Sequence, residues 1–321
     1  MKNYLEAFDF SNDEKPIKSV IELLSLEQLF LKPNRPMSWI VDGLCIESGV
    51  SIICGKPKSG KSTLARQMIL SVANGYDFLE RPCDKSTVLY YALEEIEDEV
   101  SRGFRQLGAE GSEKIYVHVG PIKNSKSHLK QAIEKYQPKL VVIDPLFRFL
   151  KVKDLNDYSE VTHQMEELSL IARSSKAHLC LLHHTNKASD STNGILGSTA
   201  IFGAVDGVLI LRRTVENSFL STRMRYGEDM SEAVLEFDYS TNMYSLGITK
   251  QDLDVEKAKT LILVYLQRAM VHGVTEAELS AEVFGVSTTG KRHALRCLVN
   301  ERRVKRSGKG GKSDPYRYSS I

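Results

Sequence analysis

The chain has 321 residues, of which 42% are hydrophobic and 26% charged, so it can bury a full core and is not disordered overall. Its apolar runs are interrupted by charge well short of the roughly 20 residues that a membrane-spanning helix needs, which excludes a transmembrane protein. The acidic N-terminus is unlike a secretory signal, the five cysteines stand singly, and the net charge is only +2. We therefore expect a cytoplasmic protein with no membrane partner and no cysteine-based zinc site.

The first 35 residues are predicted to form an N-terminal arm. They contain one amphipathic stretch, SVIELLSLEQLFL, which follows a polar segment. An amphipathic stretch buries its apolar side against another surface. The sequence leaves open whether that surface is the chain's own core or a neighbouring subunit.

Residues 36–248 have the pattern of an α/β domain, because short β-branched runs alternate with helical periods. The predicted parallel strands are GVSIICG, STVLYYALE, KIYVHVG, KLVVID and AHLCLLHH. Between them, apolar residues at helical spacing precede glycines that can end a helix, as Leu64 and Met68 precede Gly75. Beyond residue 206, DGVLILRR, SFLSTRMR and AVLEFDY follow one another through short turns, which predicts an antiparallel edge. The expected fold is a doubly wound, mainly parallel sheet.

Residues 249–321 predict a separate, winged-helix-like domain that binds nucleic acid. An apolar helix around Leu261, a short helix from Thr275 and a third from Ser287 or Thr288 precede two short strands around a glycine turn. On the third helix, Ala294, Leu295, Leu298 and Val299 recur on one side and Thr289, Arg292, Arg296, Asn300 and Arg303 on the other. The polar side suits a DNA groove, although it is also what an ordinary solvated helix face looks like.

The charge of the chain is concentrated at its C-terminal end. Residues 286–321 carry ten cations against Glu301 and Asp314, a net charge of +8 that leaves −6 on the rest of the chain. The cations are Lys291, Arg292, Arg296, Arg302, Arg303, Lys305, Arg306, Lys309, Lys312 and Arg317. A basic block on a mildly acidic body is typical of a polyanion-binding protein, and the alternative is a solvated basic tail.

Residues 55–62 read GKPKSGKS and match the phosphate-binding loop GxxxxGK(S/T). A strand precedes the loop and a helix follows, as anion binding at a helix N-terminus requires, whereas an accidental glycine turn would lack this context. The lysine can reach the outer phosphates and the serine hydroxyl can bind magnesium. The sequence thus predicts that ATP and Mg²⁺ are bound by Gly55, Lys56, Pro57, Lys58, Ser59, Gly60, Lys61, Ser62 and Thr63.

Carboxylates end two of the predicted strands. Asp144 ends LVVID, where it can hold magnesium through water, although a strand-end aspartate can also be a simple turn residue. Glu94 and Glu95 end the strand STVLYYALE, where a base must orient the attacking water. We predict Glu94 as the catalytic base, with Glu95 as the alternative; both could instead only begin an acidic helix.

Two further pairs of polar residues, one of histidines and one of arginines, are candidate residues of the nucleotide site. His183 and His184 end AHLCLLHH; with no other ligand at zinc spacing, one of them is better interpreted as a polar sensor of the γ-phosphate. Arg223 and Arg225 lie on a predicted hairpin far in sequence from the phosphate loop, where they can reach a neighbour's nucleotide or be ordinary surface charges.

The ordered segments GKPKSGKS, YYALEE, LVVID, LLHHTNK and RMRYG resemble those of RecA-like ATPases, specifically the RepA-type hexameric replicative helicases of the DnaB/RecA superfamily. The resemblance covers roughly residues 36–247. It implies a homo-oligomer, a hexameric ring with nucleotides between subunits and single-stranded DNA in the channel. It also implies these roles: phosphate and Mg²⁺ binding by Lys61 and Ser62, a base in Glu94, a second carboxylate in Asp144, a sensor in His184, and a trans-acting arginine in Arg225 with Arg223 as companion.

Two loops are predicted to face the channel. TNKASDSTNGILG contributes Lys187, and FLKVKDLNDY contributes Lys151 and Lys153. Contacts with a threaded strand are mainly to phosphate, so flexible loops with a few lysines would suffice.

The sequence therefore predicts a ring-forming, ATP-hydrolysing DNA motor, a replicative helicase of a plasmid, phage or mobile element. The winged-helix-like domain departs from the minimal RepA-type helicase and could recruit duplex DNA at an origin, a junction or a protein. The alternatives are a recombinase-type or loader ATPase that does not unwind DNA, and a DNA-binding regulator that ATP only controls. A small-molecule kinase fits least, because nothing resembles an acceptor-binding lid.

Overall fold

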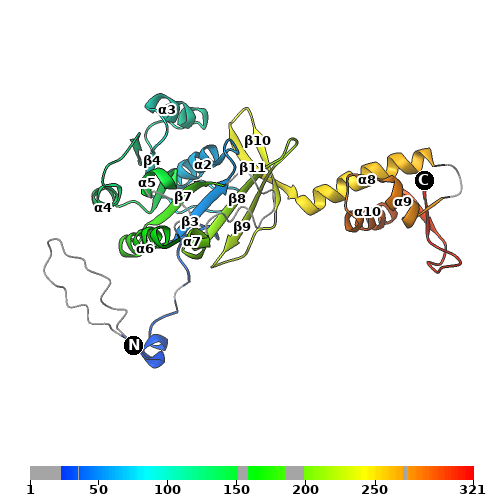
Figure 1. Cartoon of the computed structure of the whole chain (residues 1–321), viewed down its shortest axis with the longest axis horizontal. Coiled ribbons are helices and arrows are strands. Elements are labelled where there is room, and N and C mark those ends of the chain that lie inside the picture. The colour runs from blue at the N-terminus through cyan, green and yellow to red at the C-terminus, as the bar shows by residue number, and fades with distance from the viewer. Residues whose placement is uncertain (1–22, 35, 151–157, 186–198, 270–272) are drawn as a thin grey trace. The chain divides into compact units, whose positions relative to one another are not determined.

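The computed structural model describes residues 23–34, 36–150, 158–185, 199–269 and 273–321 (Figure 1). Most of the two predicted channel loops, including Lys151, Lys153 and Lys187, lies outside these residues, as does most of the N-terminal arm. No helix in the described ranges is long and apolar enough to span a bilayer.

The chain divides into two compact units between Met37 and Ser38, two residues after the predicted end of the arm. In the first unit, the described part of the amphipathic stretch contains one short helix, α1 (Leu26–Phe30). Ser25 begins it with a capping box, in which the side chains of Ser25 and Gln28 each accept a hydrogen bond from the other residue's backbone N–H. All residues of α1 are exposed, so the structure does not choose between the two surfaces that its leucines could contact.

The second unit is built on a sheet of nine strands in the described part of the chain, in the order β11-β10-β9-β8-β3-β7-β6-β4-β5. The bounds are β3 (Val50–Gly55), β4 (Val88–Ala92), β5 (Ile115–Val119), β6 (Leu140–Asp144), β7 (His178–His184), β8 (Gly207–Arg213), β9 (Ser218–Met224), β10 (Ala233–Asp238) and β11 (Met243–Thr249). The strands from β8 to β5 in this order are parallel, and β9, β10 and β11 extend the sheet antiparallel. The predicted doubly wound sheet with an antiparallel edge is confirmed.

Helices cover both faces of the sheet, because successive side chains of a strand point to opposite faces. Tyr90 of β4 packs on the face covered by α2 and α3, whereas Leu89 and Tyr91 pack on the face covered by α4 to α7. The bounds are α2 (Lys61–Asn74), α3 (Glu97–Gln106), α4 (Ser125–Tyr136), α5 (Leu146–Leu150), α6 (Tyr158–Ser175) and α7 (Thr199–Gly203). As predicted, α2 ends at Gly75, which adopts the left-handed conformation at φ 74°.

Two short strands that the sequence did not predict precede the central strand. They are β1 (Trp39–Val41) and β2 (Cys45–Ile46), paired antiparallel, and they contribute Ile40, Val41, Leu44 and Cys45 to the core on the α2 face. Burial of these apolar side chains therefore fixes the segment that leads into the domain.

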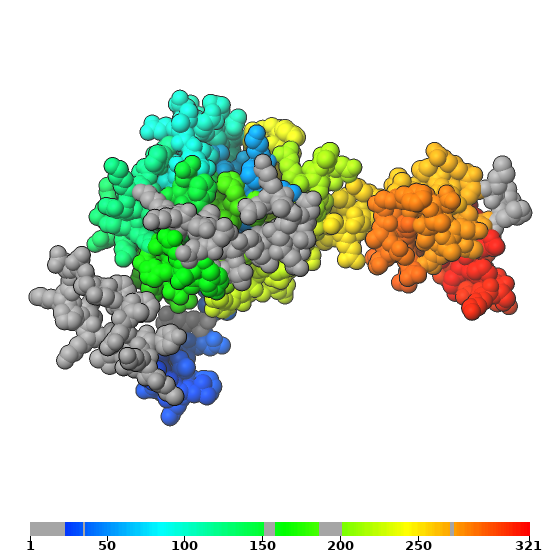
Figure 2. Space-filling model, viewed as in Figure 1, coloured from blue at the N-terminus to red at the C-terminus, as the bar shows by residue number. Residues whose placement is uncertain are grey.

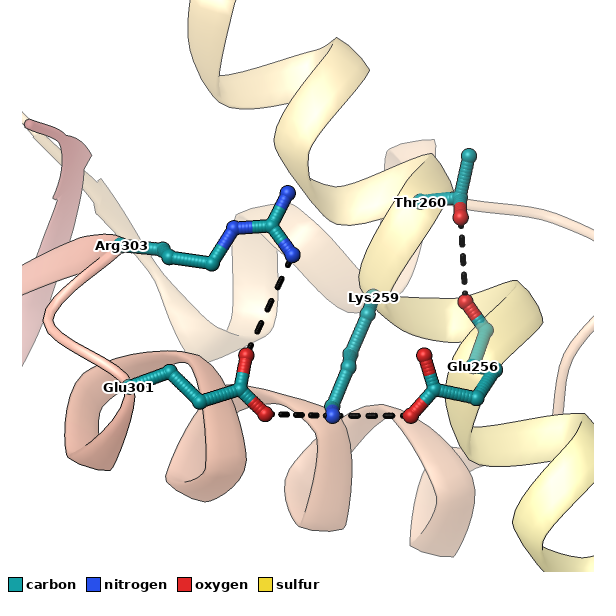
Figure 3. A network of polar contacts seen from close by, with 5 residues as sticks. All are labelled: Glu256, Lys259, Thr260, Glu301 and Arg303. Atoms are coloured by element: carbon teal, nitrogen blue, oxygen red, sulfur yellow. Dashed lines mark hydrogen bonds and ion pairs between the residues drawn. The ribbon is translucent and has the colours of Figure 1, made fainter.

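Residues 250–321 have a hydrophobic core of their own. The region contains α8 (Lys250–Arg268), β12 (Val274–Thr275), α9 (Glu276–Glu282), α10 (Thr288–Asn300), β13 (Val304–Ser307) and β14 (Arg317–Ser320), the last two paired as a hairpin. Ala294, Leu295 and Leu298 of α10 are buried, and Arg292 and Arg296 are exposed; the surface of this region is orange to red in Figure 2. Lys259 of α8 donates to Glu256 and to Glu301 at the end of α10 (2.8 and 2.6 Å), so an ion pair ties the two helices together (Figure 3).

One cation of the basic block is not on the surface. Lys291 is buried on the inner side of α10, where its ammonium donates to the carbonyl of Ser280 at 3.0 Å. Counting charges along the sequence cannot separate this lysine from its exposed neighbours.

Candidate active site

The loop of residues 55–62 joins the central strand β3 to the N-terminus of α2. Lys58 and Gly60 adopt positive φ angles of 62° and 94°, so the chain doubles back before the helix starts. The Lys61 ammonium lies inside this turn and donates to the carbonyls of Gly55 and Lys56 at 2.9 and 2.8 Å. A cation thus occupies the centre of the loop, at a helix N-terminus that also favours anions.

Burial lowers the pKa of Lys61 to about 8, although Asp144 and Cys54 act in the opposite direction. The residue is only 4% exposed, so its charged form has lost most of its hydration. An anion in the loop would restore the stability of the charged form. The loop is therefore chemically suited to phosphate.

Gly60 has no room for a side chain. A Cβ there would collide with the hydroxyl of Tyr244, which comes from β11. The Tyr244 backbone is held in place by Gln67 of α2, whose amide accepts from its N–H at 2.7 Å and donates to its carbonyl at 2.9 Å. The antiparallel edge of the sheet thus closes one side of the phosphate loop, a contact that the sequence did not reveal.

Asp144 lies beside the loop at the end of β6. Burial raises its pKa, whereas a hydrogen bond with Ser62 and the charges of Arg66 and Lys61 act to lower it. The Tyr90 hydroxyl donates to its carboxylate at 3.5 Å. A hydroxyl and a carboxylate side by side are oxygen ligands of the kind that Mg²⁺ prefers, so Ser62 and Asp144 fit a magnesium site.

Glu94 and Glu95 follow β4, and the structure gives them different partners. Glu95 forms an ion pair with Arg66 of α2, and its pKa is raised by burial against the pull of that arginine. Glu94 accepts from the Arg148 guanidinium of α5 at 2.8 Å. Both line a cavity of about 900 Å³ that also contains Arg148, but of the two only Glu95 has a described partner on the phosphate-loop helix. Each glutamate is thus paired with an arginine, and Glu94 as the base, with Glu95 as the alternative, stays a prediction.

The two histidines end β7, and His184 is paired with Gly55 in the parallel register. Burial lowers the pKa of His183 to about 4, with His184 and Lys61 acting in the same direction. Burial and Lys61 also lower the pKa of His184, and Glu94 opposes them. Both rings are therefore neutral at pH 7, and in the part of the chain that the structure describes their Nδ1 atoms are shielded and without a hydrogen-bond partner. A neutral ring beside Gly55 can respond to a phosphate without repelling Lys61.

Arg223 and Arg225 lie at the opposite end of the sheet. Met224 is paired with Gly207 at the start of β8, whereas the phosphate loop follows the end of β3. Along β8, Gly207 is four residues from Leu211, the residue that is paired with Gly55 of the phosphate loop. Four residues of strand span about 13 Å at 3.3 Å per residue. The arginines form ion pairs with nearby acids, Arg225 with Asp206 at 3.2 Å and Arg223 with Asp229 at 3.5 Å. The structure does not bring them to the chain's own phosphate loop.

The functional residues that sequence reasoning missed are the cations and the tyrosine that contact this site. Arg66, Arg148 and Tyr244 carry no motif of their own. The two adjacent glutamates after a buried strand were a signal that cations could be close by, since a partly buried carboxylate such as that of Glu95 is stabilised by a partner. Which arginines supply them depends on the packing of α2 and α5.

A phosphate loop at the end of the central strand, with a buried carboxylate ending a neighbouring parallel strand and helices on both faces, defines a RecA-like P-loop ATPase core, which binds nucleotide. Residues 18–190, more than half of the chain, match the family described as "AAA domain", and the chain belongs to this family.

Solved structures are similar to this chain in fold. A KaiC-like protein from the hyperthermophilic archaeon Pyrococcus horikoshii OT3 is 16% identical, with a TM-score of 0.50 over 66% of this chain and 100% of that one. A second solved structure, an isolated ATPase domain, is 13% identical, with a TM-score of 0.49 over 62% of this chain and 85% of that one. At 16% identity the first likeness shows a shared fold alone. No curated protein matches the chain in sequence.

Proposed function

We propose that the chain is an ATP-dependent, ring-forming DNA motor, a replicative DNA helicase of a plasmid, phage or mobile element. The observation that carries this proposal is the position of Arg225, at the end of the sheet away from the phosphate loop. An arginine that cannot reach its own nucleotide can act on the nucleotide of a neighbouring copy. Hydrolysis that needs two subunits is the basis of a ring motor.

Within one protomer, each residue has a defined task. Lys61 and the backbone N–H groups of residues 55–63, except that Pro57 has none, bind the phosphates. Ser62 and Asp144 would hold Mg²⁺, Asp144 through water. The ion would supply positive charge to the β- and γ-phosphates. Glu94 accepts a proton from the attacking water and aligns it. His184, neutral and beside Gly55, donates a hydrogen bond to the γ-phosphate and senses its loss.

The neighbouring protomer supplies the remaining charge. Arg225 of one copy would neutralise the charge that develops on the phosphates bound by the next copy, with Arg223 beside it. Trans-acting arginines contribute about 10³ to 10⁵ in rate in other P-loop enzymes. In the single chain Arg223 is paired with the half-exposed Asp229, and Arg225, itself half-exposed, with the mostly buried Asp206. The pair of Arg223 is a surface ion pair of the kind that is weak enough to exchange.

A pair of variants tests the shared site. Lys61→Ala should abolish nucleotide binding, because the loop loses its central cation. Arg225→Ala should leave binding intact and reduce turnover at least about a thousandfold. If Arg225→Ala hydrolysed ATP at the normal rate with saturating DNA, the shared-site mechanism would be wrong.

DNA is proposed as the partner on the strength of the C-terminal charge. Nine of the ten cations there are exposed, including Lys305, Arg306, Lys309 and Lys312 of the hairpin. If about six of the nine meet phosphates, log affinity should fall with log salt at a slope near −4 on single strands and near −5 on duplex. Replacing those four by glutamine should bring the single-strand slope to about −1.5.

A matched control keeps the change of net charge constant. Four exposed lysines of the ATPase core can be replaced by glutamine instead: Lys85, Lys114, Lys123 and Lys176. This variant should retain the original slope. An unchanged slope in the hairpin variant would show that the C-terminal region binds something other than nucleic acid.

One alternative has support in the structure. Residues 250–321 have their own core and a basic surface, as expected for a DNA-binding regulator in which ATP only controls assembly. ATP turnover below background at saturating DNA would favour that function. A recombinase-type or loader ATPase would hydrolyse ATP but fail to displace a strand from a forked duplex.

A further inference from the structure

A second cavity, of about 360 Å³, lies at the edge of the sheet between α4 and the outermost strands β4 and β5. Tyr91 of β4 and the inner side of α4 belong to the core on one face of the sheet, whereas α2 with its phosphate loop belongs to the other. The cavity is therefore separate from the candidate active site. Its volume is within the range of small-molecule sites.

One wall of this edge cavity is a stack of aromatic rings. Tyr116 of β5 and Tyr136 of α4 stack with their centroids 4.0 Å apart at 29°. The Lys135 ammonium lies 4.8 Å from the centroid of Tyr136. Tyr116 is 43% exposed, so a large part of its ring is open to a ligand. An exposed tyrosine fixed by a second ring is a rigid platform for a planar molecule.

The opposite wall supplies hydrogen-bonding groups. The Tyr91 hydroxyl and Nδ1 of His128 share a hydrogen bond at 3.2 Å, and the rings of His118 and His128 lie 5.2 Å apart. Nε2 of His118 is shielded from solvent and has no hydrogen-bond partner among the described residues. A shielded polar atom without a partner is costly, and in native proteins it usually has a ligand or water beside it.

One histidine of this wall, His128, has a lowered pKa. Burial lowers the pKa of His128, and His118 acts in the same direction, so His128 is neutral at pH 7. A neutral imidazole can donate or accept one hydrogen bond at each nitrogen. Among the described residues of the lining, the only ammonium is that of Lys135, which lies on the side of the tyrosine stack.

We propose that the edge cavity binds an unstacked nucleobase, which stacks on Tyr116, hydrogen-bonds to His118 and His128, and places its phosphate near Lys135. Stacking on an aromatic ring combined with hydrogen bonds to a base edge is how proteins hold single bases. A simple anion would find one lysine and, in His128, a neutral imidazole. A metal ion would find two histidines, and the described residues contain no cluster of three or more His, Cys, Asp or Glu. An aliphatic side chain would leave Nε2 of His118 unpaired.

The base can come from a free nucleotide or from a nucleic acid strand, and the experiment separates the two. The background combines Lys61→Ala, which removes binding at the phosphate loop, with glutamine at Lys305, Arg306, Lys309 and Lys312, which weakens binding of oligonucleotide phosphates to the C-terminal hairpin. Dissociation constants are measured for AMP and dTMP by equilibrium dialysis, and for a fluorescein-labelled dT oligonucleotide by anisotropy. Ribose 5-phosphate and an abasic oligonucleotide serve as probes without a base.

Binding of at least one base-containing probe is expected in this background, with the baseless probes much weaker. Tyr116→Ala should weaken that binding by about 5- to 100-fold, and Tyr116→Phe should retain it, because stacking needs only the ring. His118→Leu should also weaken it while leaving the melting temperature unchanged or higher, since a shielded unpaired nitrogen is removed. Tyr76→Ala, at a tyrosine that is 66% exposed and outside the cavity, is the matched control and should have no effect.

Stronger binding of the mononucleotides would assign the cavity to a free nucleotide, and stronger binding of the oligonucleotide to a strand; both support the proposal. Equal binding of baseless probes, or equal binding by Tyr116→Ala and Tyr76→Ala, would overturn it. So would unchanged binding in a Tyr116→Ala variant that no longer oligomerises, because the cavity would then be a protein-docking site. None of these outcomes depends on whether the chain is a motor, which the turnover of Arg225→Ala tests separately.

Discussion

The charge of Lys61 controls how tightly the phosphate loop can hold a nucleotide, and its pKa of about 8 puts the loss of that charge within easy reach of an experiment. Burial is the main cause of the low pKa, and phosphates in the loop would oppose it strongly. The pKa of Lys61 in the complex should therefore return to its usual value near 10.4 or above. Above pH 8, binding must be accompanied by uptake of a proton.

The magnitude follows from this linkage. In the free protein the charged fraction of Lys61 falls from about 90% at pH 7 to about 10% at pH 9, so the dissociation constant should rise about tenfold over that interval. Cys54 and His183 do not titrate there, because burial raises the pKa of the first to about 12 and lowers that of the second to about 4. The terminal phosphate of ADP, with a pKa of about 6, is already ionised.

The assay is a titration with a fluorescent ADP derivative at pH 7, 8 and 9 and constant ionic strength. Lys61→Arg is the control, because a guanidinium stays charged over the whole range and its affinity should be flat. A wild-type dissociation constant that changes less than twofold between pH 7 and 9 would refute the reasoning. It would mean that Lys61 is not the buried, poorly hydrated cation of the binding site.

Three further changes have defined outcomes. Gly60→Ala should weaken ADP binding about tenfold or more in the same titration, because the new Cβ collides with the Tyr244 hydroxyl and the backbone is at φ 94°. Lys259→Met should lower the free energy of unfolding of the C-terminal region by about 1 to 2 kcal/mol in urea, since the tie to Glu301 is lost (Figure 3). Burial lowers the pKa of His178 to about 4, so between about pH 6.5 and pH 4 the histidine is protonated in the unfolded chain but not in the folded chain. The free energy of unfolding should therefore be highest above about pH 6.5 and should fall by about 2 kcal/mol by pH 5.

Each of these predictions has a matched control. Gly203→Ala meets nothing within 4 Å and has no positive φ, so it should not affect binding. Lys257→Met removes only an exposed pair with Glu216 and should change stability by less than about 0.5 kcal/mol. His178→Gln should flatten the acid dependence, and His163→Gln, at an exposed histidine, should not. Identical results for a variant and its control would contradict the physical cause given for it.

The parallel core was predictable because its signals are local. A strand that is buried on both faces, such as Val50–Gly55, is a continuous apolar run, and a loop that binds phosphate through its own backbone must be contiguous in sequence. The strand Met243–Thr249 was not predicted, because it lies at the antiparallel edge and mixes half-buried with exposed residues. It nevertheless brings Tyr244 against Gly60, a contact that no local pattern encodes.

The candidate active site could likewise be predicted only where its signals are local in the sequence. Asp144 and Glu94 could be placed at strand ends from the sequence, since parallel strands end at one edge of the sheet. The partners of Glu94 and Glu95, which are Arg148 and Arg66, come from helices elsewhere in the chain and could not be predicted from the strand end. Charge counting included Lys291 in the basic block without placing its side chain, and the structure buries it.

The central claim is that one protomer binds ATP and the next supplies the arginine needed to hydrolyse it. Mixing Lys61→Ala with Arg225→Ala in equal amounts tests this claim most directly, because each variant is inactive alone. In a mixed oligomer, about one quarter of the boundaries would pair an intact phosphate loop with an intact arginine. DNA-stimulated ATP turnover should therefore recover to about a quarter of the wild-type rate. Oligomers that are shown to contain both variants and yet remain inactive would contradict the claim.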